Sequence, residues 1–311
     1  MSGFADVSVV MPAYNNAATI ARALASIAAQ TVKPREVIVV DDGSADNTLA
    51  VAAAQPMAGI RLRLFRQANS GAGAARNRAI AAASGTWLAF LDADDEWLPA
   101  KLERSLAVTE GGDLVMSSHN LFAVTPEGEH MIDSRARWRS DPADPYRTLF
   151  LRGYISSSTV LVRRDAVVAV GGFDAGLRSA QDYELWLAVL AAAGDRFETF
   201  ADPLLRYTID PAGITGRIDR KVACSLAILD RHMGVLKRRP GPVLKPLLLR
   251  LLIVHVEAVR GHLARGDRLA ALRQGLMLPL RLVCALARLP SADGARPDFL
   301  AQLVPAEEVS P

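Results

Sequence analysis

The sequence predicts an α/β fold in which a mostly parallel central sheet carries helices on both faces, followed by an all-helical C-terminal extension. Short apolar runs alternate with segments of helical apolar spacing along the first half of the chain. Polar clusters begin at Asp41 and Asp92, directly after two of these runs, and ligands bind at such strand ends in parallel sheets. Beyond about Ala223, the pattern is helical only.

Each expected strand of the first half is a short apolar or β-branched run. In the third of them, Ile60–Leu64, apolar residues alternate with arginines, which predicts a less buried strand. In chain order these strands are Val7–Met11, Glu36–Val40, Ile60–Leu64 and Trp87–Leu91. The helices expected between them are Ala17–Gln30, Thr48–Ala54 and Gly71–Ser84. Asp46 is expected to cap the second helix, because aspartate is a preferred residue at helix starts.

The pattern loosens after Leu114–Ser117, and the later elements are shorter. They are a strand at Ser156–Val162, a helix at Arg164–Val170, a turn at Gly171–Asp174, a helix at Ala180–Ala193 and a strand at Leu204–Tyr207. We therefore expect an α/β domain over residues 1–222, a basic helical extension over 223–290 and a loose tail over 291–311, which is rich in proline and acidic residues.

The net charge of +3 is unevenly distributed. Residues 237–288 contain eleven basic and two acidic side chains, so an anionic surface partner would meet the chain there. The two cysteines, Cys224 and Cys284, indicate neither a disulfide framework nor a zinc cluster. No signal peptide is evident, and no uninterrupted apolar stretch reaches about 18 residues. The expected location is the cytoplasm, either free or peripheral on the inner face of the membrane.

Three carboxylates, Asp92, Asp94 and Asp95, directly follow the expected strand Trp87–Leu91. Like charges this close repel one another unless a cation lies among them, and Mg²⁺ or Mn²⁺ prefers oxygen ligands. Such an ion could also neutralise a leaving diphosphate. The alternative is a solvated acidic turn, and these residues alone do not decide between the two.

Two further loops could contact a nucleotide. Asp42 follows a strand within Asp41–Thr48, where its carboxylate could accept from a base or ribose and Gly43 would allow a close backbone approach. Asn69–Asn77 is a glycine-rich helix start with Arg76 one turn in, which suits a phosphate. Each could equally be an ordinary loop.

Asp182 lies in the first turn of the expected helix Ala180–Ala193. Aspartate at such a position is usually a cap, but it could serve as a general base if the fold brings it to the strand ends.

Together, these motifs resemble family 2 of the glycosyltransferases, which have the Rossmann-like GT-A fold. The resemblance covers roughly residues 5–210 and is specific for the family but not for the sugar. The segments that carry it are Val9–Asn15, Asp41–Asp46, Asn69–Asn77, Asp92–Asp95, Gly171–Asp174 and Gln181–Trp186.

The resemblance implies an inverting transfer from a nucleoside-diphosphate sugar, with a UDP-sugar as the expected donor, to a glycan or lipid-linked acceptor in cell-surface polysaccharide or glycolipid synthesis. Asp182 would be the catalytic base, and Mg²⁺ or Mn²⁺ would lie at Asp94 and Asp92, with Asp95 as a further candidate ligand. The implied nucleotide-sugar site comprises Pro12, Tyr14, Asn15, Asp42, Asn69, Arg76, Asp92 and Asp94.

The chain departs from the family pattern at two places. Gln181 stands where many relatives have glutamate, and Tyr207–Asp210 replaces a Tyr-Arg-x-His segment, with Asp210 at the histidine position. The missing arginine and histidine are side chains that the resemblance would place in contact with the acceptor or the diphosphate. Residues 210–216 are expected to form a mobile flap over the site because they contain glycines and follow the last strand.

Two other functions fit the sequence less well. A sugar-phosphate nucleotidyltransferase would need a glycine-rich loop where Pro12–Asn16 stands, and the basic segment lacks the aromatics of a nucleic-acid binder. A catalytically silent nucleotide-sugar-binding or interaction domain is the main alternative. For the basic helices, packing on the α/β domain or on a second copy is favoured over contact with an anionic membrane.

Overall fold

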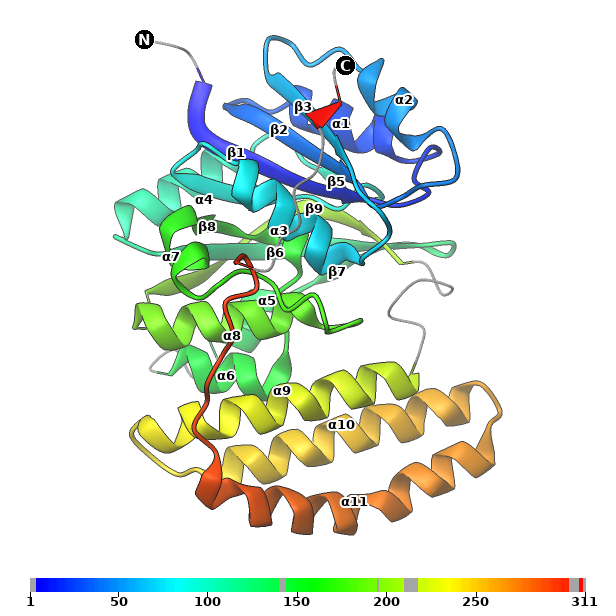
Figure 1. Ribbon diagram of the computed structural model, residues 1–311, viewed down its shortest axis with the longest axis vertical. Helices are drawn as coiled ribbons and strands as arrows, with labels where there is room; N and C mark the ends of the chain where they lie inside the picture. Colours follow the sequence, from blue (N-terminus) through cyan, green and yellow to red (C-terminus); the bar gives the residue numbers. More distant parts are fainter. Residues whose placement is uncertain (1–3, 140–143, 195, 210–217, 302–307, 310–311) are drawn as a thin grey trace.

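The computed structural model describes residues 4–139, 144–194, 196–209, 218–301 and 308–309. Over these residues the chain forms one ten-stranded sheet with helices on both faces (Figure 1). The strand order is β10-β3-β2-β1-β4-β8-β6-β9-β5, and β7 pairs with β6 outside this order. The expected α/β architecture is confirmed.

The first half of the sheet is parallel, since β1 pairs in parallel with both β2 and β4, and β3 pairs with β2. Its elements are β1 Phe4–Ala13, α1 Ile20–Ala28, β2 Lys33–Asp41, α2 Thr48–Ala53, β3 Arg61–Arg66, α3 Ala72–Ala82 and β4 Trp87–Phe90. All the strands and helices expected here are present, with ends shifted by a few residues. The carboxyl ends of β1, β2 and β4 therefore share one edge of the sheet.

The second half is mixed: β8 is antiparallel to β4 and β6, whereas β9 is parallel to β6 and antiparallel to β5. Its elements are β5 Glu96–Trp97, α4 Lys101–Gly111, β6 Met116–Thr125, β7 Gly128–Ile132, α5 Ser134–Trp138, α6 Pro145–Arg152, η1 Ser157–Thr159, β8 Leu161–Arg163, α7 Arg164–Ala169, α8 Gln181–Ala193 and β9 Phe197–Thr208. Most of β6 and all of β7 had no counterpart in the expected elements.

The sequence pattern missed β6 because its interior is polar yet buried. Ser118 bonds to Thr199 of the neighbouring β9 at 2.8 Å, and the Asn120 amide donates to Asp133 at 3.1 Å. Such pairs satisfy buried polar groups without an apolar repeat. A second difference concerns the expected strand Ser156–Val162, whose first part is instead the 3₁₀ turn η1.

The sheet separates two apolar cores because neighbouring residues of a strand point to opposite faces. Val9 of β1 packs toward α1 and α2, whereas Val10 packs toward α3 and the later helices. The second core also takes in Leu229, Leu247 and Leu251 of the C-terminal helices. These helices therefore pack on the α/β domain through their inner faces.

The C-terminal extension is a layer of three long helices at the bottom of Figure 1. It comprises α9 Ile218–Arg238, α10 Leu244–Ala264 and α11 Arg268–Arg288, followed by the short turn η3 Leu289–Ser291. Within the described chain, Arg268–Ser291 is the one helical segment long and apolar enough to cross a membrane by length and composition. Arg250, one of the eleven basic residues of this region, is buried against Tyr183, with its guanidinium 4.8 Å from the ring centroid.

The segment after η3 was expected to be a loose tail, and the structure differs for the residues that it describes. The backbone amides of Phe299 and Leu300 donate to the Gly171 carbonyl at 2.9 and 3.1 Å. β10, Glu308–Val309, pairs antiparallel with β3, and Arg63 binds Glu308 at 2.8 and 3.0 Å. Residues 292–301 thus run from the helical layer back along the body (Figure 1), and β10 lies at the edge of the sheet.

Candidate active site

The candidate site lies at the shared carboxyl edge of β1, β2 and β4. The loops after these strands carry Tyr14, Asp42 and Asp92. The turn η1, the first turn of α8 and the end of β9 complete the site from the second half of the chain, as their hydrogen bonds show. Residues that are far apart in the sequence are thereby brought to one place.

Arg76 and Asp92 form an ion pair at the centre of this site. The Arg76 Nη2 donates to Asp92 Oδ1 at 2.6 Å, and its guanidinium lies 5.3 Å from the centroid of the Phe173 ring. Burial acts to lower the pKa of Arg76, but Asp92 and Asp182 outweigh it, so the pKa is raised and the charge is kept. The buried Arg76 Nε has no hydrogen-bond partner among the described residues, so this cation retains binding capacity.

Asp182 joins this pair from the first turn of α8. Its Oδ2 accepts from the Ser157 hydroxyl at 3.2 Å, and its Oδ1 accepts from the Tyr183 amide at 2.8 Å. Burial raises the pKa of Asp182, while the nearby Arg76 lowers it. The side chain remains partly accessible. The fold thus supplies the proximity that sequence alone did not establish, between a candidate base, a cation and the Asp92 carboxylate.

Asp94 and Asp95 have different surroundings. Burial and the Asp92 charge raise the pKa of the half-buried Asp94. Asp95 is fully buried, its Oδ2 accepting from Ser158 at 2.6 Å and its Oδ1 from the Thr208 amide at 3.0 Å. Both Asp95 oxygens therefore accept hydrogen bonds that fix this turn to η1 and β9, and its role as a further metal ligand stays a prediction.

Asp42 joins the β2 loop to the start of α3. Its Oδ1 accepts from Gln67 Nε2 at 2.7 Å and from the Ser70 amide at 2.9 Å, and its Oδ2 accepts from the Gly71 amide at 2.7 Å. Gly43 has φ +78, and a Cβ there would lie 3.0 Å from the Asn69 amide. Because a carboxylate oxygen can accept two hydrogen bonds, Oδ2 can accept a further one from a nucleoside.

The remaining residues expected to bind the nucleotide line the same edge. Pro12 is buried within β1, whereas Tyr14 is 51% exposed beyond its end. Asn15 adopts φ 54, and its side chain accepts from the Ala45 amide at 2.9 Å, which ties the first loop to the second. Asn69 is exposed. Tyr14 and Asn69 thus have accessible side chains suited to a ligand.

Tyr207 and the η1 serines were not among the expected site residues. Burial raises the pKa of the Tyr207 hydroxyl, and Asp95, Asp92, Asp182 and Asp94 raise it further, which puts this residue close to all four carboxylates. The tyrosine of the family segment was the available signal for it. Ser157 and Ser158 had no signal, because they follow from the turn that replaces the expected strand.

The donor set fits a divalent ion held by few protein ligands. Nowhere in the described ranges do three or more His, Cys, Asp or Glu side chains converge as a metal cluster. Asp92 and Asp94 are half-buried and repel each other, which a cation would relieve. Mg²⁺ in proteins commonly takes one or two carboxylates and completes its shell with substrate phosphates. The expected flap over the site, residues 210–216, lies outside the described residues.

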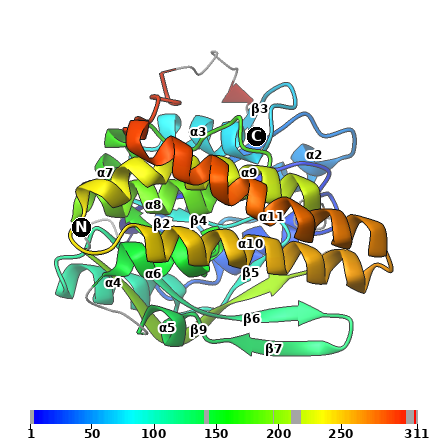
Figure 2. The ribbon, with the colours of Figure 1, turned by 90° about the horizontal axis from the view of Figure 1, so that it is seen from below.

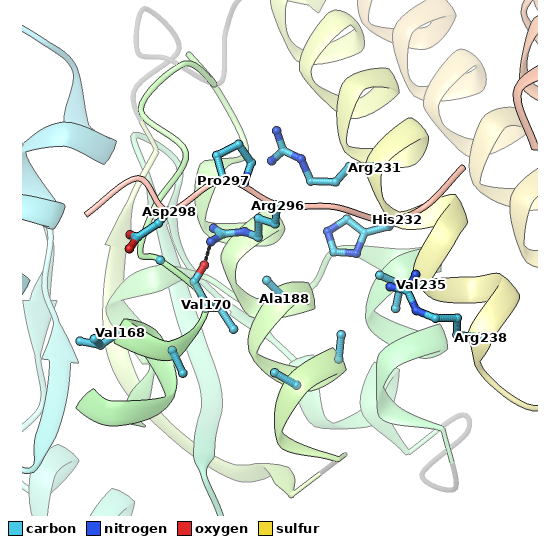
Figure 3. A pocket seen from close by; sticks show the side chains of 15 residues that line it. Val168, Val170, Ala188, Arg231, His232, Val235, Arg238, Arg296, Pro297 and Asp298 are labelled. Atoms are coloured by element: carbon cyan, nitrogen blue, oxygen red, sulfur yellow. Dashed lines mark hydrogen bonds between the residues drawn. The ribbon is translucent and has the colours of Figure 1, made fainter. Parts of the chain in front are cut away.

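A separate cavity of about 370 Å³ lies beneath the C-terminal segment and has none of the predicted site residues in its lining (Figure 3). Arg231 and His232 of α9 border it, together with Arg296, which bonds to the Val170 carbonyl. Arg231 and Arg296 both pair with Glu184, at 2.9 and 2.8 Å. These arginines are thus used to join the C-terminal segment and α9 to α8.

The fold and this edge define the class of protein. Residues 8–171 match the family model described as glycosyl transferase family 2. The chain belongs to this family, and the resemblance drawn from its motifs is confirmed.

The chain is 33% identical over 253 residues to the amylovoran biosynthesis glycosyltransferase AmsB of Erwinia amylovora, covering 75% of this chain and 79% of AmsB. It is 34% identical over 209 residues to the succinoglycan biosynthesis protein ExoO of Rhizobium meliloti, covering 61% of this chain. That match spans 57% of the length of ExoO, and another spans 36% of an uncharacterized glycosyltransferase of Nostoc.

Solved structures show the same fold at lower identity. TarS of S. aureus in complex with UDP-GlcNAc superposes with a TM-score of 0.65 at 18% identity, covering 94% of this chain and 89% of that one. The mannosyltransferase PcManGT of Pyrobaculum calidifontis, in complex with GDP-Man and Mn²⁺, gives a TM-score of 0.59 at 21% identity, covering 93% and 88%. The GT-A-like fold is thus shared.

Proposed function

We propose that the protein transfers a sugar from a UDP-sugar to an acceptor hydroxyl, with inversion at the anomeric carbon, in the synthesis of a cell-surface polysaccharide or glycolipid. Family membership supports glycosyl transfer. The names of ExoO and AmsB support polysaccharide synthesis, and the UDP-GlcNAc complex of TarS supports the donor class.

The observation that carries the proposal is the meeting of Asp182, Arg76 and Asp92. They come from the start of α8, from α3 and from the end of β4, and their charges act on one another. The buried cation of Arg76 suits a diphosphate, and the carboxylate of Asp182 beside it suits the proton of an acceptor hydroxyl.

In the proposed reaction, Asp182 takes the proton of the acceptor hydroxyl. The acceptor oxygen attacks the anomeric carbon, and the bond from that carbon to the diphosphate breaks. Ser157 keeps one Asp182 oxygen in place through its hydrogen bond of 3.2 Å. Arg76 offers its charge to the departing diphosphate. Base catalysis of this kind contributes about 10²–10⁴-fold in rate.

Asp94 and Asp92 would hold Mg²⁺ or Mn²⁺ together with the donor phosphates. When bound, such an ion stabilises the negative charge that develops on the leaving group. The protein-side contribution is the rigid placement of the turn: the Asp94 carbonyl accepts from Arg22 at 2.9 Å and from the Thr208 hydroxyl at 2.8 Å.

The test is a calorimetric titration of the purified protein with UDP, GDP and dTDP, each with and without Mn²⁺, beside Asp94→Ala. We expect UDP alone to bind, in a manner that needs both Mn²⁺ and Asp94. Asp202→Ala, which removes an exposed carboxylate paired with Arg104, is the matched control and should bind as the wild type does.

Two results would contradict the proposal in different ways. Preference for GDP or dTDP would overturn the UDP-sugar donor. Binding of none of the three would favour an interaction domain. A catalytically silent binding domain would bind UDP but release none from a UDP-sugar in the presence of acceptor extract, whereas the proposed enzyme releases UDP and loses this release in Asp182→Asn.

A further inference from the structure

We propose that the outer faces of α10 and α11 dock the protein on an anionic lipid membrane. The inference rests on the helical layer alone and is independent of the donor and of the reaction. The surface, called here the outer helical face, is defined by exposed apolar side chains of both helices: Leu248, Leu252, Val256, Leu263, Leu269, Leu272, Leu276, Leu280, Val283 and Leu286.

The part of this face on α11 is a continuous apolar stripe. Its residues recur every three or four positions, which places them on one side of a helix. Leu269 and Leu276 are 79% and 70% exposed, and Leu280 is 55% exposed. Scattered exposed leucines are ordinary on protein surfaces, but a stripe of this length along one helix marks an interaction site.

α10 extends the surface sideways. It packs along α11, and both helices lie across the side of the molecule that faces the viewer in Figure 2. Leu252 and Leu263 are 45% and 52% exposed and face away from the core. The two helices together therefore offer a broad apolar surface.

The inner side of α11 is bound to the body, which decides how it can meet a lipid bilayer. Ala285 is buried, and Leu278 and Leu282 pack against the same core as the sheet. Arg281 Nη1 contacts His255 Nε2 of α10 at 3.1 Å, and Arg288 pairs with Asp230 of α9. A helix held in this way lies along the bilayer surface rather than across it, although its length and composition suffice for a span.

Charge identifies the occupant of this face as an anionic lipid surface. The exposed basic residues on the two helices and their connection outnumber the exposed acidic residues Glu257 and Asp267; they include Lys245, Arg260, Arg265, Arg268 and Arg273. Leucines that enter the acyl boundary, with arginines beside them at the level of the headgroups, define an interfacial amphipathic helix.

A second copy of the chain fits this face less well. A two-fold interface is self-complementary, so it would bring two faces of the same positive sign together. The like charges would oppose association, whereas anionic headgroups would neutralise them.

The experiment is vesicle flotation of the full chain with phosphatidylcholine alone and with phosphatidylcholine containing phosphatidylglycerol. We expect binding to the anionic vesicles and little to the neutral ones. Leu269→Gln/Leu276→Gln/Leu280→Gln should weaken binding at least 100-fold, because three apolar side chains no longer leave water. Arg268→Gln/Arg273→Gln should weaken it by about 30-fold.

Met131→Gln is the control, because Met131 on β7 is 56% exposed but lies outside the helical layer. It should float like the wild type, and all variants should keep the wild-type circular dichroism and melting temperature. Equal binding to both vesicle types, or unchanged binding of the leucine variant, would overturn the proposal. So would a dimer by light scattering that the leucine substitutions dissociate while the wild type fails to float.

Discussion

Asp182 shows what the fold adds to a single residue. In sequence it is an acidic residue at a helix start, where the usual function is capping. In the structure, the Ala180 backbone is left-handed with φ 57, and the Asp182 side chain accepts from Ser157 of η1 and from the Tyr183 amide. Together with Arg76 and Asp92, these contacts create the environment of a candidate base.

At this scale we predict the effect of Asp182→Asn. The variant loses the group that accepts the proton, so kcat should fall by about 10²–10⁴-fold while UDP affinity stays near the wild-type value. Steady-state kinetics and calorimetry measure the two quantities. Asp165→Asn, at the start of α7, changes an exposed aspartate that pairs with Arg163 and should leave kcat unchanged. An active Asp182→Asn enzyme would remove Asp182 from the reaction.

The same residue predicts a pH dependence. Burial raises the pKa of Asp182 above the ordinary 3.8, with Arg76 opposing the shift. Because the base must be ionised, kcat/KM should fall as pH falls through this raised pKa, so the acid limb lies above pH 3.8. A profile of kcat/KM against pH locates the limb. A flat profile down to pH 3.8 would contradict the assignment.

At the scale of elements, α4 and the turns around it hold the site from behind. Lys101 opens α4 and is fully buried, with its Nζ 3.2 Å from the Val160 carbonyl and 4.4 Å from the centroid of the Trp97 ring. Trp97 in turn donates to the Ser158 carbonyl at 2.8 Å. This packing fixes η1, and η1 carries the serines that bind Asp95 and Asp182.

Lys101 therefore predicts a stability effect. Burial lowers the pKa of Lys101 from 10.5 to about 7. Between these values the unfolded chain holds a proton that the folded chain has released, so the free energy of unfolding should rise with pH across this window. Lys101→Met removes the penalty for the buried charge and should be more stable at pH 6.5, by about 1.4 kcal/mol for each pKa unit of the shift.

Urea unfolding at several values between pH 6.5 and 9.5 checks this prediction. In Lys101→Met the rise with pH should be smaller than in the wild type. Lys221→Met is the control, because Lys221 is exposed and pairs with Glu257 on the surface, so its replacement should change stability little. A Lys101→Met variant that is less stable at pH 6.5 would show that the charge is accommodated.

At the scale of the whole molecule, the C-terminal segment joins the helical layer to the domain that carries the site. Arg296 donates to both Glu184 oxygens at 3.0 and 2.8 Å and also bonds to the Val170 and Gly172 carbonyls. Glu184 is fully buried two residues after Asp182. Burial acts to raise the pKa of Glu184, but His232 and Arg296 outweigh it and hold the pKa well below its usual range.

Arg296→Ala should lower the free energy of unfolding by about 3 kcal/mol, because it leaves a buried carboxylate with fewer partners. Arg231 remains at 2.9 Å, which keeps the loss near the lower end for such pairs. Since the pKa of Glu184 is depressed, this stabilisation is present above about pH 4.5 and declines as pH falls below it. The difference between variant and wild type should therefore shrink in acid.

Urea unfolding at pH 7 and pH 4 measures both effects. Arg104→Ala is the comparison, since Arg104 and Asp202 form an exposed pair whose loss should cost less than about 1 kcal/mol. A loss no larger than that of Arg104→Ala would mean that the C-terminal segment contributes little to the stability of the body.

Several features of this protein were predictable from local pattern alone. The parallel strands β1, β2 and β4 are short apolar runs, and such runs can be identified from the sequence pattern alone. Parallel strands share their direction, so the polar residues that follow them lie at one edge of the sheet. The placement of Asp42 and Asp92 at this edge was therefore predictable. The family, too, is carried by short contiguous motifs, four of which lie within the matched residues 8–171.

The tertiary structure decided the features that depend on contacts between distant residues. The burial of Asp95 and its hydrogen bonds depend on Ser158 and Thr208, which lie 63 and 113 positions away. The burial of Arg250, the path of the C-terminal segment and the exposure of the leucines on α11 were equally absent from local pattern. Apolar periodicity shows that a helix has two faces, but only the packed chain determines which of them meets the core and which meets solvent.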